Sequence, residues 1–387
     1  MKKINLGFVI SFNKNSWLGG NVYLLNLINQ IKRQSKSINP IIITNLDDIK
    51  KNFKEFKNIK ILNSRLFQMN KWNRIISKLQ ILLFGKDFLI DRFLLKNNVN
   101  ILSHFFITGR NSKIKSLFWI PDFQEIHNPR FINLRRRILR KFNLFFAIKN
   151  SNNIILSSNT VRDDLKKINF EAYKKAAVFR PFFETPNKIN NLKILKKYNI
   201  KNNFFLLPNQ YWKHKNHFLI LNILKNLKLK KINNIQVIST GYFYDYRHPN
   251  FTNEIVDYIK KYDLEKNYKI LGVIPYKDLM DLMYFSIAVI NPSQSEGWSS
   301  TVEQAKSMGK MVLLSNLKVH KEQLPYRNFY FNPTNQEKLK DKMINLSRNF
   351  NFKVEKKRMK LAKKRMILIK KKFINEYVNY IHKLYNE

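Results

Sequence analysis

The chain has 387 residues, enough for two domains of ordinary size, and its hydrophobic content of 44% excludes a disordered protein. It contains no cysteine, which excludes disulfides and thiolate metal sites, and its seven histidines show no HExxH-type spacing. The formal charge of +46 suggests attraction to a polyanion, either nucleic acid or an anionic membrane face. The abundance of Lys, Asn, Ile and Phe favours codon bias as the source of most of this charge.

The chain begins with two lysines and a short apolar run, Met1–Ser11. The run is too short for a secretory signal and lacks a small-residue cleavage site, so it predicts a first buried parallel strand. No window reaches 18 uncharged apolar residues, and no membrane-spanning helix is expected. We therefore expect a cytoplasmic protein, and attachment to the inner face of the plasma membrane stays open.

Short apolar runs alternate with amphipathic stretches, which is typical of βαβ units and a parallel sheet. Leu24, Leu27, Ile28 and Ile31 at helical spacing follow the first run. The predicted strands are Asn5–Ser11, Ile41–Thr44, Ile59–Leu62, Asn100–Ser103, Ser116–Ile120, Asn153–Ser157, Ala177–Arg180, Phe204–Leu207, Ile235–Ser239, Tyr268–Leu271, Ala288–Asn291 and Met311–Ser315.

The segment Arg180–Asn190 contains two prolines and no periodicity, and we interpret it as an interdomain linker. After Pro333 the pattern is helical only, with a Lys-rich stretch over 353–372. The predicted fold class is α/β, with two Rossmann-like, doubly wound parallel-sheet domains. In such folds ligands bind at the carboxyl ends of the strands, so a ligand in the cleft between the domains is expected.

Paired glycines, Gly19 and Gly20, follow the first strand and open a helix. They would let the backbone approach a phosphate or a sugar closely, although a plain strand-to-helix turn is the alternative. The pair is no G-x-G-x-x-G fingerprint, so no nicotinamide site is predicted. Asp47–Asp48 is adjacent instead of spaced as Asp-x-Asp, and we expect it in a surface loop.

Asp122 and His127 follow the predicted strand Ser116–Ile120, where the carboxyl end would face the cleft. His127 could contact a sugar or an acceptor, and a structural role is equally consistent with its position. Further on, Arg135–Lys149 carries an apolar stripe of Ile138, Phe142, Phe145 and Phe146 under a basic face. Packing of this stripe on the sheet is favoured, and contact with an anionic membrane or an anionic acceptor is the alternative. The apolar stretch Lys71–Leu95 is a second candidate for membrane contact.

The segment Leu207–His217 follows the first strand of the second half and contains Lys213 and Lys215. These lysines could neutralise a leaving diphosphate as its charge develops. In so basic a chain, an ordinary basic turn is the alternative.

The most informative segment is Ile287–Ser315: a buried strand, a polar loop with Glu296, a helix, a stop at Gly309 and a second strand. Backbone N–H groups at a helix start bind phosphate, and nearby carboxylates bind neutral hydroxyls. A molecule that carries both groups is a sugar nucleotide. A capping box with Ser300 as the cap would explain Glu303 without any ligand, whereas Glu296 lies in the loop and has no such explanation.

This segment, with Glu296-Gly-Trp-Ser-Ser-Thr-Val-Glu303-Gln-Ala-Lys, resembles the donor site of retaining GT-B glycosyltransferases of family 4, the glycosyl transferases group 1. The continuation Leu313–Gln323 matches the V-H-x-E-Q of one subgroup, although the carboxylates are one residue closer than the common E-x7-E spacing. The resemblance implies that Glu296 binds the donor sugar and Glu303 the nucleotide ribose. The phosphates would lie against the backbone of Gly297, Trp298, Ser299 and Ser300.

The resemblance carries over less completely elsewhere. Lys215 falls on a lysine that handles the diphosphate, but Gln210 stands where the family has an arginine. Gly19 and Gly20 match a loop against the donor, and Pro121 replaces a histidine, so that only Asp122 carries over there. The implied domains are 1–184 on the acceptor side, 185–362 for the nucleotide sugar, and a C-terminal helix, 363–387, that returns to the first domain.

The implied activity is transfer of a hexosyl unit from a nucleotide diphosphate sugar to a glycan or glycolipid hydroxyl, with retained anomeric configuration and no metal or other cofactor. A cell-surface polysaccharide or lipopolysaccharide is the implied product. Two alternatives stay open: another GT-B enzyme, either a sugar-nucleotide epimerase or a phosphorylase, and a basic nucleic-acid-binding protein. The second lacks a nucleic-acid module, so we expect no nucleic-acid partner.

Overall fold

The computed structural model describes residues 3–10, 18–44, 58–67, 71–104, 107–127, 129–184, 189 and 191–387. The chain forms two compact units. Unit 1 comprises Met1–Phe123, Leu134–Phe182 and Leu368–Glu387, and unit 2 comprises Gln124–Asn133 and Phe183–Ile367. The short segment Gln124–Asn133 thus groups with unit 2, although it lies inside the predicted domain 1–184. Trp17 and Asp47–Asp48 lie outside the described residues.

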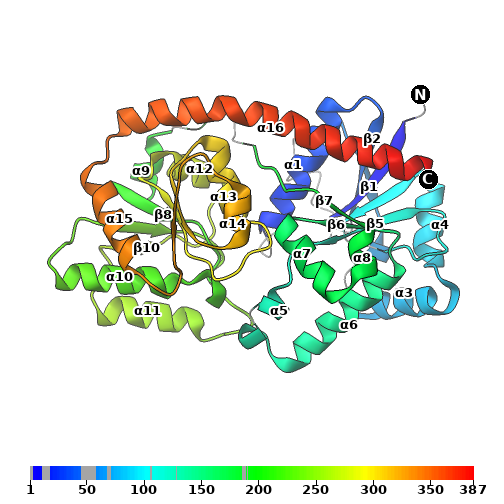
Figure 1. Cartoon of the computed structure of the whole chain (residues 1–387), viewed down its shortest axis with the longest axis horizontal. Coiled ribbons are helices and arrows are strands. Elements are labelled where there is room, and N and C mark those ends of the chain that lie inside the picture. Colours follow the sequence, from blue (N-terminus) through cyan, green and yellow to red (C-terminus); the bar gives the residue numbers. More distant parts are fainter. Residues whose placement is uncertain are drawn as a thin grey trace. The chain divides into compact units, whose positions relative to one another are not determined.

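Unit 1 is built on a parallel sheet with the strand order β3-β2-β1-β4-β5-β6-β7 (Figure 1). Its strands are β1 (Ile4–Ile10), β2 (Ile38–Thr44), β3 (Lys60–Asn63), β4 (Ile101–His104), β5 (Lys115–Ile120), β6 (Asn153–Leu156) and β7 (Ala176–Val178). Its helices are α1 (Leu18–Gln34), α3 (Lys71–Phe84), α4 (Phe88–Lys96), α6 (Leu134–Asn150), α7 (Asn159–Ile168) and α8 (Phe170–Lys174), with the 3-10 turn η2 (Arg65–Phe67).

Unit 2 repeats this topology in a parallel sheet with the order β10-β9-β8-β11-β12-β13. Its strands are β8 (Phe204–Leu207), β9 (Gln236–Ser239), β10 (Tyr268–Ile270), β11 (Val289–Asn291), β12 (Val312–Ser315) and β13 (Asn328–Phe331). Its helices are α5 (Gln124–His127), α9 (Lys193–Lys197), α10 (His217–Leu229), α11 (Phe251–Lys261), α12 (Tyr276–Phe285), α13 (Ser300–Met308), α14 (Lys318–Gln323) and α15 (Glu337–Arg348), with the 3-10 turns η3 (Pro129–Phe131) and η4 (Lys213–Lys215).

The central strands of unit 2, β8, β11 and β12, are buried on both faces, as continuous apolar runs predict for a parallel sheet. Successive side chains point to opposite sides: Leu207 and Ile290 belong to one apolar core cluster, whereas Leu206 and Val289 belong to the other. In both sheets the strand order reverses beside the first strand, between β1 and β4 and between β8 and β11. Ligands of doubly wound sheets bind at this point.

All the strands expected from the sequence are present, with ends that differ by a few residues. The helix predicted from Leu24, Leu27, Ile28 and Ile31 is also confirmed, because these side chains are buried in α1. One strand was not predicted from the sequence: β13, whose first three residues are at least partly exposed at the sheet edge. After Pro333 the elements are helices only, as predicted.

A correction concerns α6. The favoured expectation was that its apolar stripe packs on the sheet, but Ile138, Phe142 and Phe145 are exposed and only Phe146 is buried. Most side chains in the first three turns of α6 are exposed, so this part of the stripe faces solvent instead of the sheet.

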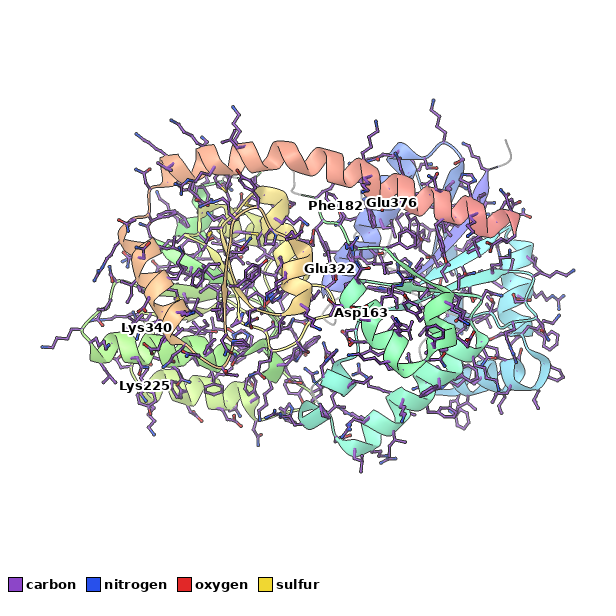
Figure 2. All side chains as sticks on the ribbon, in the orientation of Figure 1. Asp163, Phe182, Lys225, Glu322, Lys340 and Glu376 are labelled. Atoms are coloured by element: carbon purple, nitrogen blue, oxygen red, sulfur yellow. The ribbon has the colours of Figure 1, made fainter. Side chains whose placement is uncertain are left out.

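The last helix, α16 (Phe352–Asn386), belongs to both units. Its C-terminal part packs on unit 1, where the Tyr377 hydroxyl lies 2.9 Å from Ser103 Oγ and His382 Nε2 lies 2.7 Å from Ser37 Oγ. Nitrogen-tipped side chains project around the outline of each unit (Figure 2). No helix among the described residues is long and apolar enough to cross a membrane.

Candidate functional site

The candidate site lies in unit 2, where the strand order reverses. Asn209 follows β8, Asn291 ends β11, and the loop with Glu296 connects β11 to α13. Asn209 Nδ2 donates to Asn291 Oδ1 at 3.1 Å, so this side-chain bond joins the two diverging crossovers. The polar residues that end these strands therefore meet at the position where doubly wound sheets bind ligands.

Glu296 and Lys215 form an ion pair at the centre of the site. Lys215 Nζ lies 2.7 Å from Glu296 Oε1, and only 13% and 7% of the two side chains are exposed. Burial opposes the charged carboxylate, but the ammonium of Lys215 and the hydroxyl of Ser293 outweigh it and hold the pKa of Glu296 below its usual value. Glu296 is therefore an ionised acceptor at neutral pH.

The donors to Glu296 all use one of its two oxygens. Oε1 accepts from Lys215 Nζ, from Ser293 Oγ at 2.8 Å and from Asn291 Nδ2 at 3.4 Å. Among the described residues no donor bonds to Oε2. Because an ionised carboxylate accepts on both oxygens, Oε2 can bind a ligand hydroxyl, and Lys215 has two further N–H groups for an anion.

Asn291 positions the loop. Its side chain is fully buried and donates to Ser299 Oγ at 2.7 Å, while its Oδ1 accepts from Ser293 Oγ at 2.6 Å. Thr301 Oγ1 donates to the Pro208 carbonyl at 3.1 Å and so ties the start of α13 to the end of β8. These bonds fix the carboxylate of Glu296 beside the helix start.

The N-cap of α13 is Ser299, whose Oγ accepts from the Val302 amide, and the expectation that Ser300 is the cap is wrong. Glu303 is then the fourth helical residue, one position too far for a capping box. Its buried carboxylate instead accepts from Gln323 Nε2 at 3.1 Å and lies 3.5 Å from Lys306 Nζ. Capping therefore does not account for Glu303.

His320 adds a second buried group beside Glu296. Its Nδ1 lies 2.8 Å from the Ser315 carbonyl, to which it donates, so that Nε2 is the unprotonated nitrogen. Burial lowers the pKa of His320, although the charge of Glu296 opposes this shift. Within the described part of the chain, Nε2 has no hydrogen-bond partner. A neutral ring of this kind can accept a hydrogen bond from a ligand.

The other predicted site residues of unit 2 differ in burial and in their contacts. Gly297 and Ser299 are buried, and Trp298 and Ser300 are half-buried; the first three lie between Glu296 and α13, and Ser300 is the first residue of that helix. In the turn η4, Lys213 has an exposed side chain, and its backbone amide donates to Asp245 Oδ2 at 3.1 Å. The carbonyl of Gln210 accepts from His217 Nε2 at 3.2 Å, and its side chain is half-buried.

The structure does not bring all the predicted residues together within unit 2. Gly19 and Gly20 lie in the first turn of α1 in unit 1. Asp122 is half-buried after β5 in unit 1, whereas His127 is exposed at the end of α5 in unit 2. Five further residues shape the site and were not predicted from the sequence to have a role in it: Asn209, Asn291, Ser293, His320 and Gln323. A polar Asn at the end of a buried apolar strand is the signal that could have indicated Asn291.

Residues 190–366 match the family described as glycosyl transferases group 1. This match covers the whole candidate site, from Asn209 to Gln323. A curated relative, the O-antigen chain mannosyltransferase RfbU of Salmonella typhimurium, is 22% identical over 212 residues. That alignment covers 54% of this chain and 55% of the relative, so it spans about half the length of each.

Two solved structures are similar over nearly the whole chain. A glycosyltransferase from Rickettsia africae has a TM-score of 0.71 at 17% identity, with 100% of both chains covered. Anabaena HepE in complex with UDP and glucose has a TM-score of 0.69 at 13% identity, with 97% of this chain and 100% of that chain covered. At these identities the likeness shows the fold. The predicted fold class, GT-B with two Rossmann-like parallel-sheet domains, is confirmed.

Proposed function

We propose that the protein is a retaining glycosyltransferase of family 4 that transfers a hexosyl unit from a nucleotide diphosphate sugar to a glycan or glycolipid hydroxyl. The observation that carries the proposal is the buried pair of Glu296 and Lys215 beside the start of α13, at the reversal point of the sheet. The family match of residues 190–366 supports it. The name of the Salmonella relative supports a product in cell-surface polysaccharide or lipopolysaccharide synthesis.

In the proposed complex, Glu296 Oε2 accepts a hydrogen bond from a hydroxyl of the donor sugar. The backbone from Gly297 to Ser300, apart from the Ser299 N–H that donates to Gln323 Oε1 at 3.3 Å, and the two further N–H groups of Lys215 bind the diphosphate, whose charge suits the positive end of a helix. Glu303 binds the ribose of the nucleotide. Gln210, Lys213, Trp298, Gly19 and Gly20 are proposed as further donor contacts, and Asp122 and His127 as contacts to the sugar or the acceptor.

The proposed reaction breaks the bond between the sugar's anomeric carbon and the leaving diphosphate oxygen. Negative charge develops on that oxygen, and Lys215 and the start of α13 stabilise it. The acceptor hydroxyl bonds to the same carbon on the same face and passes its proton to the leaving diphosphate, so the anomeric configuration is retained. No protein nucleophile takes part. The scheme requires no metal, which unchanged turnover in EDTA would support.

A thermal-shift screen with UDP, GDP, ADP and CMP and their common sugars tests the proposal. A ligand at 100 times its dissociation constant stabilises the fold by about 2.7 kcal/mol, which is readily measured. We expect a selective rise with one nucleotide. No rise with any of them, together with salt-dependent DNA binding, would contradict the proposal and favour the nucleic-acid alternative.

The matching nucleotide sugar then separates transfer from epimerisation. An epimerase would convert the donor without an acceptor, whereas a transferase needs an acceptor hydroxyl and releases the nucleotide diphosphate. NMR spectra of the sugar before and after incubation without acceptor measure the difference. A new sugar epimer in that sample would replace the transferase proposal with the epimerase alternative.

A further inference from the structure

Exposed apolar side chains concentrate on two helices of unit 1. On α3, Trp72, Leu79 and Leu83 follow helical spacing and form one stripe, and the exposed fractions of Trp72 and Leu83 are 70% and 72%. An apolar stripe normally faces the core. Among the residues of α3 whose burial is described, 72–84, only Ile81 is buried, and it lies on another side of the helix, so the stripe faces solvent.

The same holds for α6, where Ile138 and Phe142 are 63% and 57% exposed. The two helices form one surface. Lys78 on α3 donates to Asn143 Oδ1 on α6, and its ammonium lies 5.6 Å from the ring centroid of Phe142. Figure 1 shows α3 and α6 next to each other in unit 1. We call the exposed side chains Trp72, Leu79, Leu83, Ile138 and Phe142 the α3–α6 face.

The surroundings of this face are basic. The sequences of α3 and α6 contain no Asp or Glu. Arg135 and Lys141 are exposed on α6 beside its apolar stripe. Aliphatic and aromatic side chains that alternate with Arg and Lys, without acidic residues, are typical of helices that lie in the headgroup region of a bilayer.

We propose that the α3–α6 face rests on the surface of an anionic lipid bilayer. A second copy of the chain would bring the same dense positive charge against this face, and the repulsion would oppose pairing. Nucleic acid would neutralise the charge but would leave the branched aliphatic side chains uncovered. An anionic bilayer meets both requirements of this face, neutralisation of its charge and cover for its apolar side chains. Its headgroups neutralise Arg and Lys, and its acyl boundary covers Leu83, Ile138 and Phe142. The proposal goes beyond glycosyl transfer, which can use soluble acceptors.

Vesicle flotation of the full chain tests the proposal. The probes are vesicles of phosphatidylcholine alone and vesicles in which part of it is replaced by phosphatidylglycerol. We expect flotation with the anionic vesicles and little with the neutral ones. Binding that does not depend on phosphatidylglycerol, or no binding at all, would overturn the proposal.

Two pairs of variants separate the apolar contribution from the charge. Leu83→Ser with Ile138→Ser removes apolar contact, and we expect the partition coefficient into anionic vesicles to fall about tenfold or more. The matched control is Leu229→Ser with Leu361→Ser, two leucines that are equally exposed in unit 2 and that should leave partitioning unchanged. Because all four side chains face solvent, the variants should fold, and an unchanged melting temperature checks this.

Arg135→Gln with Lys141→Gln removes two charges at the face, with Lys260→Gln and Lys338→Gln in unit 2 as the matched control. Each lost charge should weaken binding to anionic vesicles by about fivefold, and the control pair should weaken it less. Both charge variants could lose vesicle binding equally while the Leu83→Ser, Ile138→Ser variant loses none. That result would mean non-specific attraction by the whole molecule and would overturn the proposal. Sedimentation gives a further test. Wild-type protein that sediments as a dimer, and a Leu83→Ser, Ile138→Ser variant that sediments as a monomer, would also overturn the proposal.

Discussion

At the scale of single residues, Glu296 and Lys215 depend on each other because both side chains are largely buried. Removal of one member of a buried pair leaves the other charge unpaired and costs about 3–5 kcal/mol. We expect Glu296→Gln to lower the free energy of unfolding by about 3 kcal/mol and kcat/KM by orders of magnitude. Urea unfolding and turnover of the donor identified by thermal shift measure the two effects.

A double variant separates these effects. Glu296→Gln with Lys215→Met removes both charges, so most of the lost stability should return. Turnover should stay low, because the hydroxyl acceptor and the phosphate donor are both gone. Near-wild-type turnover in either variant would contradict the role assigned to Glu296.

Glu303 gives a second prediction at this scale. Ser299, and not Glu303, caps α13, and Glu303 is proposed to bind the ribose, so Glu303→Gln should weaken nucleotide binding by about 1.5–3 kcal/mol. Isothermal titration with the matching nucleotide measures this. Lys306→Met is the control, since it removes the partner 3.5 Å away on the same helix. If Glu303→Gln and Lys306→Met lose the same stability and leave the nucleotide affinity unchanged, Glu303 stabilises the fold and does not bind the nucleotide.

The limit of sequence reasoning at this scale is the long-range hydrogen bond. Glu296 was identified because a carboxylate in a loop before Gly297 has no local explanation. Asn209 and Gln323 were not identified, because each forms a hydrogen bond with a residue far away along the chain. Asn209 bonds to Asn291, and Gln323 bonds to Glu303. The choice of Ser300 over Ser299 as the cap failed because both serines precede the helix and only the backbone angles distinguish them.

At the scale of elements, buried apolar runs predicted the strands well because both faces of a parallel sheet exclude water. The exception, β13, lies at the sheet edge, where only Phe331 is deeply buried and the apolar run is short. Its three consecutive aromatic residues, Phe329–Phe331, were a usable signal, because aromatic side chains favour strands. The exposed stripe of α6 could not be predicted, since the amphipathic pattern is the same whether the partner is a sheet or a membrane.

The junction of β12 with α16 gives a pH prediction. Lys310 precedes β12, is buried, and lies 3.4 Å from Glu355 on α16. Burial lowers its pKa to about 8 from the ordinary lysine value of 10.5, and the charge of Glu355 opposes the shift. Between these values the unfolded chain holds a proton that the folded chain has lost. Stability should therefore rise with pH by about 1.4 kcal/mol per unit across this window.

Lys310→Met should lack this rise, because methionine fills a similar volume and does not titrate. Urea unfolding of both proteins at a series of pH values between about 8 and 10.5 measures the difference in slope. Lys260→Met, an exposed lysine on α11, is the matched control and should keep the wild-type slope. Parallel curves for wild type and Lys310→Met would show that Lys310 keeps an ordinary pKa.

At the scale of the whole molecule, the charge of +46 spreads well beyond the α3–α6 face. Nitrogen-tipped side chains project around both units in the view of Figure 2. Like charges at this density repel each other and destabilise the compact state. Salt shortens the range of the repulsion, because the Debye length falls from about 30 Å at 0.01 M to about 8 Å at 0.15 M.

We therefore expect the melting temperature to rise with sodium chloride over this range, and a charge-reduced variant tests the cause. Lys260→Glu, Lys338→Glu and Lys356→Glu replace three exposed lysines of unit 2 that have no described ion pair. The triple variant should be more stable at low salt and less sensitive to added salt, and the matching Lys→Gln triple should fall between it and the wild type. A melting temperature that falls with salt would mean instead that the buried pairs at Lys215, Lys310 and Arg327 outweigh the surface repulsion.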